Sequence, residues 1–570
     1  MLVIALVSAV VGVVVGAGNA RRDAANAFVT DWTKQDFQGM YSHLSSASAK
    51  QTSLQDLAGA YLGAQRTATA TAIDPGSIDG PTSVNGEDIV RVQMKIRTRL
   101  FGVVAGELDL PFDGDKIAWD PHLTFPGLQD GELLGRHLDL GTRGSILARN
   151  GAVLASGPAA SRTVGSASSQ VVGETGKPDT DQVGQLQAQG FPSDVSVGIS
   201  GLERAFNSRL AGTPGGQLLA VKNSSGGDVP AGTPGRVLAT SQAKPGQPVT
   251  TTIDSKIQAA TANAIGGIAG GAVVLNAKNG NVLAMAGSAY SAPAPPGSTF
   301  KIITTTAALE SHAVKLSDTF ALADHASVGG RDIGNSNGEI CGGTFVQAFA
   351  ESCNSVFAPL GPKIGGKKMV DTAQKYGFNS PPELYSPDLT ASLDLPKSSI
   401  PTSIGSDLDL GVTAIGQGEV LATPLEMATV AQTIAAKGLR SPTAIATDPG
   451  LAPDAKPVRV TDANTAGIIK NLMIDVVNNG TGTNADLGRI QVAGKTGTAE
   501  LGPKPNQPPA KPLAPGETPP KPQQILDAWF TCFAPADKPR IVVTTFVADA
   551  SGDGGQVAAP IARSILSSAL

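Results

Sequence analysis

The chain has 570 residues, too many for a single hydrophobic core, and this length predicts about three domains. Hydrophobic residues make up 41% of it, which is ample for folded domains, whereas 68 glycines and 40 prolines indicate many loops and linkers. The net charge of −5 provides no polycationic surface, which excludes nucleic acid as an expected partner.

Residues 1–18 form an apolar run that only Ser8 interrupts, close to the minimum length for crossing a bilayer as a helix. We expect a single membrane anchor or a signal peptide cleaved near Ala20, and both would send the rest of the chain through a membrane. Arg21 and Arg22 follow the run and no basic residue precedes it, the reverse of the usual bias for this orientation. We therefore expect a short basic segment upstream of the run.

The sequence of residues 20–135 predicts a small α+β domain. The stretch 89–100 alternates apolar and polar side chains, the period of a half-buried strand. No catalytic constellation occurs in this domain, so a spacer or partner-docking role is expected. Amphipathic helices are predicted around residues 24–32, 37–44 and 54–62, and further strands at 101–110 and 116–119.

Residues 141–248 are predicted to be irregular, because an Ala/Gly/Ser-rich patch covers 155–169 and Pro-Gly turns begin at Pro214, Pro234 and Pro245. A third domain is expected over 250–570. It opens with a predicted helix over 255–268, followed by strands over 271–277 and 281–286 that are joined through the hairpin turn Asn279-Gly280.

The sequence Pro296-Gly297-Ser298-Thr299-Phe300-Lys301 sets a serine one helical turn before a lysine. Residues three apart share one face of a helix, so the Lys301 amine is expected to reach the Ser298 hydroxyl. A desolvated lysine amine can take the proton of a serine and make it a nucleophile. Ser298 is also predicted at the positive helix end, where a developing oxyanion is stabilised.

Ser-x-x-Lys alone is a weak signal, because a second copy occurs at Ser241 in Pro- and Gly-rich sequence. Two later motifs strengthen the first copy. They are Ser352-Cys353-Asn354 and Lys495-Thr496-Gly497-Thr498, and Lys-Thr-Gly occurs only once. Ser-x-x-Lys, Ser-x-Asn and Lys-Thr-Gly in this order are the signature of penicillin-recognising serine acyltransferases.

With these motifs, the chain resembles the class B penicillin-binding proteins of high-GC Gram-positive bacteria, which are monofunctional peptidoglycan D,D-transpeptidases. The segment 251–258 resembles the entry into the transpeptidase domain, whereas Arg143-Gly144-Ser145-Ile146 and Gly201-Leu202-Glu203-Arg204 resemble parts of the pedestal, or dimerisation, domain. Ala148 departs from the family, which usually has an acidic residue there.

The resemblance implies a multidomain α+β and α/β fold. Residues 20–135 would form a cone-like α+β domain similar to nuclear transport factors, residues 141–248 the irregular pedestal, and residues 250–570 the serine acyltransferase (penicillin-binding/β-lactamase-like) α/β domain. The implied catalytic residues are Ser298, Lys301, Ser352, Asn354 and Lys495, and the implied substrate-binding residues are Thr496, Gly497 and Thr498.

By this resemblance, Ser298 attacks the carbonyl between two terminal D-alanines of a stem peptide. Lys301 is the base, with an amine pKa lowered by burial and by the second cation Lys495. Ser352 relays the proton to the leaving amine, and Asn354 holds Lys301 and the substrate amide. The oxyanion hole would be formed by the backbone N–H groups of Ser298 and Thr498.

Two segments lie outside the three motifs. Ile415-Gly416-Gln417-Gly418, with the helix that Pro424 opens, is expected to be structural or to form a wall of the substrate cleft. Residues 502–523 are rich in proline and favour extended geometry beside the cleft mouth, either as a linker or as a partner contact.

Three cysteines cannot all pair within one chain. Cys341 and Cys353 are plausible disulfide partners in an exported protein, but the sequence leaves their connectivity with Cys532 open. No histidine follows His325, and this absence argues against a Ser-His-Asp mechanism. No clustered His/Cys spacing indicates a metal, and no cofactor is expected.

Other members of the wider class remain possible. A D,D-carboxypeptidase differs only in using water as the acceptor, and a β-lactamase must also hydrolyse its acyl-enzyme quickly. The Glu-x-x-Leu-Asn loop of class A β-lactamases is missing between Asn354 and Lys495, as is the Glu-Asp-x-x-Phe motif of a fused glycosyltransferase. The expected partners are therefore stem peptides, penicillins and a separate SEDS-type glycosyltransferase of a cell-wall synthesis complex. The catalytic domain is expected outside the cytoplasm, on a single-pass anchor.

Overall fold

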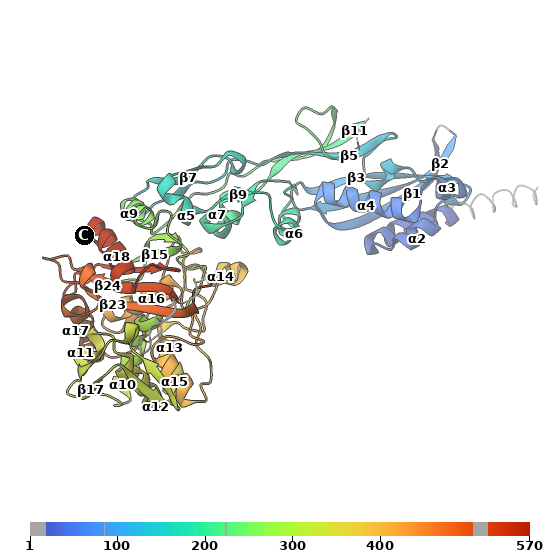
Figure 1. Cartoon of the computed structure of the whole chain (residues 1–570). Helices are drawn as coiled ribbons and strands as arrows, with labels where there is room; N and C mark the ends of the chain where they lie inside the picture. The colour runs from blue at the N-terminus through green and yellow to red at the C-terminus, as the bar shows by residue number, and fades with distance from the viewer. Residues whose placement is uncertain (1–18, 85, 193, 223–224, 506–522) are drawn as a thin grey trace, which may run out of the picture.

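The structure is a computed structural model that describes residues 19–84, 86–192, 194–222, 225–505 and 523–570. The amino-terminal half is extended and carries a compact carboxy-terminal domain at its far end (Figure 1). The predicted anchor over residues 1–18 and most of the proline-rich segment lie outside the described residues. Within the described ranges, no helix is both long and apolar enough to cross a bilayer.

The amino-terminal unit is a layer of helices on a four-stranded antiparallel sheet of order β1-β2-β3-β4. Its core includes Trp32 and Tyr61, whose rings pack edge to face at 5.0 Å. The predicted period-two strand is confirmed as β2, in which every second side chain from Val90 to Ile96 is buried and Arg91 and Lys95 between them are exposed. The elements are a helix over 19–34, α2 (Phe37–Ser42), α3 (Ser46–Gln51), α4 (Leu54–Ala68), β1 (Ala70–Val84), β2 (Glu87–Thr98), β3 (Gly102–Asp113) and β4 (Lys116–Ile117).

Strand β1 was not predicted, because Pro75-Gly76 and Gly80-Pro81 are turn signals. In the structure β1 is an edge strand, and its pairing with β2 shifts register between Pro75 and Ile78 and between Asp79 and Thr82. Prolines and glycines are accommodated at such irregular edge positions, since no ladder hydrogen bond is required of them there.

The segment predicted to be irregular contains two further sheets. One, of order β12-β5-β11-β13, packs Leu218 and Ala220 into the core of the amino-terminal unit. The other has the order β14-β6-β7-β8 and lies next to the carboxy-terminal domain. Their strands are β5 (Glu132–Asp139), β6 (Ile146–Leu147), β7 (Val153–Ser156), β8 (Thr163–Val164), β11 (Gly215–Lys222), β12 (Gly227–Asp228), β13 (Gly235–Ser241) and β14 (Val249–Thr250). Helices α5 (Ser169–Val172), α6 (Thr180–Ala188), α7 (Gly201–Ala205) and α8 (Asn207–Ala211) and the pair β9 (Thr175–Gly176) and β10 (Val197–Gly198) complete this region.

A buried ion-pair network joins the two sequence segments that resemble the pedestal domain. The Glu203 carboxylate accepts hydrogen bonds at 2.6 Å from both Arg143 and Arg162, and Glu203 is fully buried. Removing one partner of a buried ion pair leaves an uncompensated charge, so these residues hold the region together as a unit. Ala148 is buried, and the neighbouring Arg149 pairs with Asp254 at the entry to the next domain.

The carboxy-terminal domain is built on a five-stranded antiparallel sheet of order β16-β15-β25-β24-β23. Alternate residues of β15 point to opposite faces. Val273 packs in the larger core with the helices on one face, whereas Val274 packs with α9 and α18 on the other. The sheet is therefore buried on both faces and β23 is an edge strand. Its strands are β15 (Gly270–Asn276), β16 (Val282–Gly287), β23 (Ala493–Pro503), β24 (Gln524–Ala534) and β25 (Ile541–Val547).

The predicted opening helix and hairpin are confirmed as α9 (Ser255–Ile265) and the antiparallel pair β15–β16. The remaining helices are α10 (Lys301–Glu310), α11 (Phe345–Ala350), α12 (Asn354–Ile364), α13 (Gly366–Tyr376), α14 (Pro387–Leu393), α15 (Asp407–Ala414), α16 (Pro424–Ala435), α17 (Ala463–Asn479) and α18 (Ala559–Ala569). Short strands are β17 (Thr319–Ala323), β18 (His325–Val328), β19 (Arg331–Gly334), β20 (Cys341–Thr344), β21 (Leu439–Arg440) and β22 (Val458–Arg459).

Glu426, in the first turn of α16, is a buried carboxyl group whose pKa is raised to about 8, mainly by burial. One of its oxygens has no hydrogen-bond partner among the described residues. Since the folded protein favours the protonated form, stability is expected to fall as the pH rises from about 4.5 towards about 8. Glu426→Gln should remove this decline and raise the unfolding temperature at alkaline pH, as measured by calorimetry. The exposed Glu419→Gln is the control, and a decline unchanged in Glu426→Gln would contradict the assignment.

Candidate active site

A cleft of about 70 Å³ opens beside the edge strand β23 and contains most of the predicted site residues. The other predicted residues, Lys301 and Lys495, are buried at its base and reach it through hydrogen bonds. The structure thus brings together all eight residues that the three motifs predicted. The cleft is lined by Ser298, Asn335, Ser336, Asn337, Glu339, Glu351, Ser352, Asn354, Gln417, Thr481, Thr496, Gly497, Thr498, Glu500 and Asp553.

Ser298 lies in a short 3₁₀ turn, η4 (Gly297–Phe300), that leads directly into α10. The sequence predicted Ser298 at the start of an α-helix, but the α-helix begins only at Lys301. The Gly297 N–H donates to the Gly416 carbonyl at 2.9 Å, and the Thr299 hydroxyl donates to the Pro296 carbonyl at 2.7 Å. These bonds fix the turn that presents the Ser298 hydroxyl to the cleft.

The Lys301 amine is fully buried and is held by the Ser352-Cys353-Asn354 motif. It donates to the Ser352 carbonyl at 2.6 Å and to Asn354 Oδ1 at 2.7 Å, and it lies 3.3 Å from Ser352 Oγ. The sequence predicted a direct contact with the Ser298 hydroxyl, yet among the described residues no hydrogen bond joins these two groups. The hydrogen bonds to Ser352 and Asn354 therefore take the place of the predicted contact with Ser298.

Lys495, on β23, approaches the same serine from the other side. Its amine donates to Ser352 Oγ at 2.8 Å and to the Thr496 carbonyl at 3.2 Å. The Ser352 hydroxyl thus lies between two buried amines. Each amine also faces an aromatic ring, Lys301 over Phe357 at 5.1 Å and Lys495 over Phe349 at 5.6 Å.

Burial shifts both lysines towards their neutral forms, and repulsion from Lys495 adds to the shift at Lys301. Burial, and then the charge of Lys495, hold the pKa of the Lys301 amine well below its ordinary value. Burial lowers the pKa of Lys495 to about 7. The predicted direction and causes for Lys301 are confirmed. A neutral lysine amine near physiological pH can accept a proton from a hydroxyl, which an ordinary lysine cannot do.

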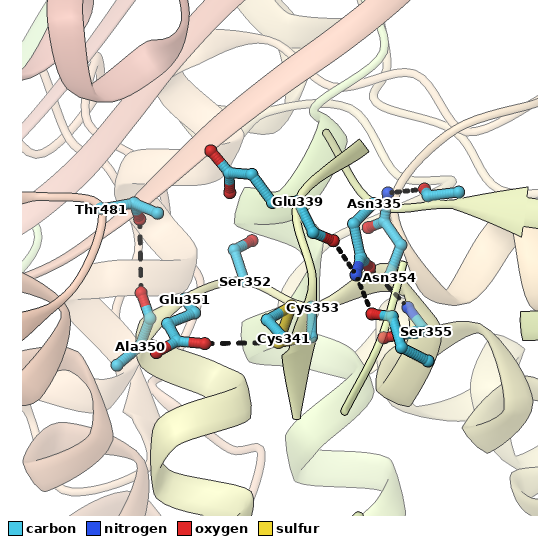
Figure 2. Close-up of a disulfide and its surroundings, with 12 residues drawn as sticks. Asn335, Glu339, Cys341, Ala350, Glu351, Ser352, Cys353, Asn354, Ser355 and Thr481 are labelled. Carbon is cyan, nitrogen blue, oxygen red and sulfur yellow. Dashed lines mark hydrogen bonds between the residues drawn. A yellow bond between two sulfur atoms is a disulfide. The ribbon is translucent and has the colours of Figure 1, made fainter. Parts of the chain in front are cut away.

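Ser352 occupies a backbone conformation that few residues other than glycine adopt, with φ of +62° between α11 and α12. A disulfide joins the next residue, Cys353, to Cys341 of β20 (Figure 2). The pairing that the sequence left open is thereby resolved, and Cys532 is a free, buried cysteine whose thiol pKa is raised by burial. The disulfide fixes the segment that carries Ser352 against β20.

The Lys495-Thr496-Gly497-Thr498 strand lies directly against the nucleophile turn. A Cβ atom on Gly497 would be 2.6 Å from the Pro296 carbonyl oxygen, so only glycine permits this approach. Thr498 Oγ1 accepts a hydrogen bond from the Gly554 N–H, and the hydroxyl of Thr496 contacts that of Thr481. The strand therefore forms one wall of the cleft.

Several cleft residues were not predicted to take part. Asn335, Glu339 and Thr481 carry no motif and reach the cleft only through the folding of loops, whereas Gln417 belongs to the predicted segment that was assigned either a structural or a cleft-wall role. Glu351 precedes Ser352 in the chain, and Glu500 lies on β23 two residues after Thr498. Both line the cleft, although the Glu351 carboxylate lies beside the disulfide, 4.0 Å from Cys353 Sγ.

Two groups of described residues place three potential metal-ligand atoms within 4.8 Å of one another. In the first, Cys341, Glu351 and Cys353, the sulfurs are bonded to each other and offer no thiolate. In the second, Asp120, His122 and Asp130 in the amino-terminal unit, Asp120 accepts a hydrogen bond from His122 at 2.8 Å. Such exposed acidic groups commonly lie together without an ion, so neither group indicates a metal centre.

The penicillin-binding protein transpeptidase domain model matches residues 270–567, and the penicillin-binding protein dimerisation domain model matches residues 161–251. The first match alone covers more than half of the chain. The chain belongs to the penicillin-binding protein transpeptidase family. The resemblance to class B penicillin-binding proteins that the motifs indicated is confirmed, whereas the likeness of the amino-terminal domain to nuclear transport factors stays a prediction.

Relatives with high-GC Gram-positive sources are similar to this penicillin-binding protein over part of its length. It is 33% identical over 299 residues to the peptidoglycan D,D-transpeptidase PbpA of Mycolicibacterium smegmatis, covering 48% of this chain and 55% of the relative. The PbpA of Mycobacterium tuberculosis strain H37Rv is 33% identical over 293 residues, covering 48% of this chain and 55% of the relative. The chain spans about half the length of these curated relatives.

Solved structures resemble this penicillin-binding protein over about three quarters of the chain. The D,D-transpeptidase domain of a peptidoglycan glycosyltransferase from Eggerthella lenta is 27% identical, with a TM-score of 0.57 over 76% of this chain and 99% of that one. Penicillin-binding protein A of M. tuberculosis, as a ceftriaxone acyl-enzyme, is 25% identical, with a TM-score of 0.56 over 76% and 99% of the two chains.

Gly416 should be required for the position of the nucleophile. A Cβ atom there would lie 2.1 Å from the Gly297 carbonyl oxygen, so Gly416→Ala should displace η4 and slow acylation of Ser298 by penicillin about a hundredfold. Gly418→Ala is the matched control, because Gly418 also has a positive φ of +71° but its nearest neighbour is the flexible Val412 side chain. Equal losses in the two variants would show that backbone strain alone explains the effect.

The charge of Lys495 should set the pH range of acylation. Because that charge lowers the pKa of Lys301, Lys495→Ala should raise the pKa of Lys301. The acidic limb of the pH–rate profile for acylation should then move to higher pH. Lys495→Arg keeps the charge and should leave the limb near its wild-type position. The measurement is the second-order rate constant for penicillin acylation against pH, and a limb that stays in place in Lys495→Ala would rule out this coupling.

Proposed function

We propose that the protein is a peptidoglycan D,D-transpeptidase that cross-links stem peptides through a serine acyl-enzyme and is inhibited by penicillins. The observation that carries the proposal is the Ser352 hydroxyl held between the buried amines of Lys301 and Lys495, beside the Ser298 turn. This arrangement supplies a neutral base and a proton relay at a serine nucleophile without histidine.

In the proposed reaction, Ser298 Oγ attacks the carbonyl between the last two D-alanines while Lys301 accepts its proton. Ser352 passes a proton to the leaving D-alanine amine, and the ester of Ser298 remains. Lys495, Thr496 and Thr498 suit recognition of the terminal carboxylate on the β23 wall. The acceptor amine of a second stem peptide then attacks the ester and releases Ser298. By family resemblance, the backbone N–H groups of Ser298 and Thr498 would stabilise the oxyanion.

A D,D-carboxypeptidase or β-lactamase would need a group that activates water. Glu351 and Glu500 line the cleft and are the carboxylates available for this role. Within the described part of the chain, neither carboxylate is hydrogen-bonded to Ser298, Lys301 or Ser352. This geometry favours transfer to an amine over rapid hydrolysis.

We further propose that residues 1–18 attach the protein to the membrane and that its catalytic domain works outside the cytoplasm. The apolar run supports the attachment, and the extended amino-terminal half supports a catalytic domain held at a distance from it. By its resemblance to class B penicillin-binding proteins, it would act with a separate SEDS-type glycosyltransferase in a cell-wall synthesis complex.

Labelling with a fluorescent penicillin tests the nucleophile and base. Wild-type protein should form one covalent adduct, and Ser298→Ala should form none. Lys301→Ala should acylate about a thousandfold more slowly, because loss of a general base removes this much rate. Ser241→Ala, which changes the other Ser-x-x-Lys copy, should label normally. Normal labelling of Ser298→Ala would contradict the proposal.

The penicilloyl-enzyme should also be long-lived, because none of the carboxylates that the structure describes is hydrogen-bonded to Ser298, Lys301 or Ser352 to activate water there. A half-life of about a minute or more is expected, since each ~1.4 kcal/mol of missing stabilisation slows deacylation tenfold. Loss of label after removal of free antibiotic measures it. Turnover of many penicillins per second would instead identify a β-lactamase.

A further inference from the structure

Two carboxylates share the cleft wall that carries Ser352. Glu339 lies two residues before Cys341, and Glu351 lies two residues before Cys353. The disulfide between these cysteines, which lie 12 residues apart in the chain, therefore brings two segments, each with its glutamate, to the same wall (Figure 2). Both side chains are exposed and both residues line the cleft.

The segment that carries Glu339 is firmly held. The buried side chain of Asn335 donates to the Glu339 carbonyl at 2.8 Å and accepts from the Ser355 N–H at 2.8 Å. One amide group thus ties the Glu339 loop to the first turn of α12, next to Asn354. In Figure 2 the Glu339 side chain extends away from this anchor on the side of the segment where Ser352 lies. Its carboxylate is therefore presented by a fixed backbone.

The negative charge at this wall has no counterpart in the described structure. No lysine, arginine or histidine of the described ranges forms an ion pair with Glu339 or Glu351. The other charged groups at the cleft are the acidic Glu500 and Asp553, and Asp553 caps a helical turn by accepting from the Gln556 N–H. The basic groups, Lys301 and Lys495, are buried on the far side of Ser352 and already hydrogen-bonded.

We propose that Glu339, assisted by Glu351, binds the acyl acceptor as a primary ammonium group and positions it beside the Ser298 ester. This assignment rests on the proposed transpeptidase function and names the acceptor side of that site. The donor's carboxylate would lie on the β23 wall and the acceptor's cation on the disulfide wall. Different chain segments would thus hold the ionic groups of the two substrates, which are otherwise similar peptides.

The chemical step balances with the groups present. The bound ammonium releases one proton to the neutral Lys301 amine, directly or through Ser352. Its nitrogen attacks the ester carbonyl, and the new C–N bond replaces the C–O bond to Ser298. The second proton passes from nitrogen to Ser298 Oγ as the intermediate collapses. Glu339 and Glu351 remain ionised throughout and act only by binding and orienting the amine.

The test measures how the acyl-enzyme partitions between an amine and water. Full-length protein is acylated with an N-acyl-D-alanyl thioester in the presence of D-alanine amide or Nα-acetyl-lysine amide, and amide and acid products are quantified against acceptor concentration. Hydroxylamine, which is mainly uncharged near neutral pH, serves as the neutral acceptor. The variants are Glu339→Gln, Glu351→Gln and the double variant, with the exposed, distant Glu87→Gln as the matched control.

The double variant should need about tenfold more cationic amine for half-maximal transfer, with each single variant showing part of the effect. Its use of hydroxylamine and its acylation by penicillin should match wild type, a pattern that general damage to the site would not produce. The assignment would be overturned if the double variant needed no more cationic amine than wild type. It would also be overturned if wild-type protein transferred the acyl group to neither cationic amine. Failure of wild-type Ser298 to acylate at all would instead contradict the proposed function.

Discussion

The site depends on the burial of two lysine amines around one serine hydroxyl. Removing an ammonium group from water is strongly unfavourable unless it is paired, and neither Lys301 nor Lys495 has a carboxylate partner in the described structure. The protein instead provides carbonyl and amide oxygens, the Ser352 hydroxyl and two aromatic rings. These partners tolerate both the charged and the neutral amine, so a proton can move at little energetic cost.

The surrounding fold holds Ser298 and Ser352 in place. The Ser298 turn is held between the Gly416 carbonyl and the β23 strand, where Gly497 permits a close approach. Ser352 has a left-handed backbone conformation that costs about 1 kcal/mol or more and persists only where its neighbours are fixed. The disulfide at Cys353 and the side chain of Asn335 fix them. The residue with the strained backbone, Ser352, is therefore also the one whose neighbours are held by the disulfide and by Asn335.

The polarity of the cleft follows from the elements that form its walls. Strand β23 contributes backbone groups, threonine hydroxyls and a buried lysine, which suit a carboxylate. The opposite chain segments, which the disulfide joins, contribute Glu339 and Glu351, which suit a cation. A transpeptidase has to bind a peptide carboxylate and a peptide amine in turn at one nucleophile. Strand β23 also carries Glu500, so the cleft meets that requirement through the different groups that its segments present rather than through walls of opposite charge.

The sequence by itself determined the chemistry and the main elements. The three motifs predicted the catalytic and substrate-binding residues, because these roles need particular side chains at fixed local spacings. The alternation in β2 and the Asn279-Gly280 turn predicted their strands, since both patterns are local. Tertiary structure decided what depends on contacts between distant segments: that the Lys301 amine bonds to Asn354 rather than to Ser298, that β1 forms despite its prolines, and that Glu339 and Glu351 share the cleft. A local pattern cannot encode these outcomes, because each is decided by which segments pack together.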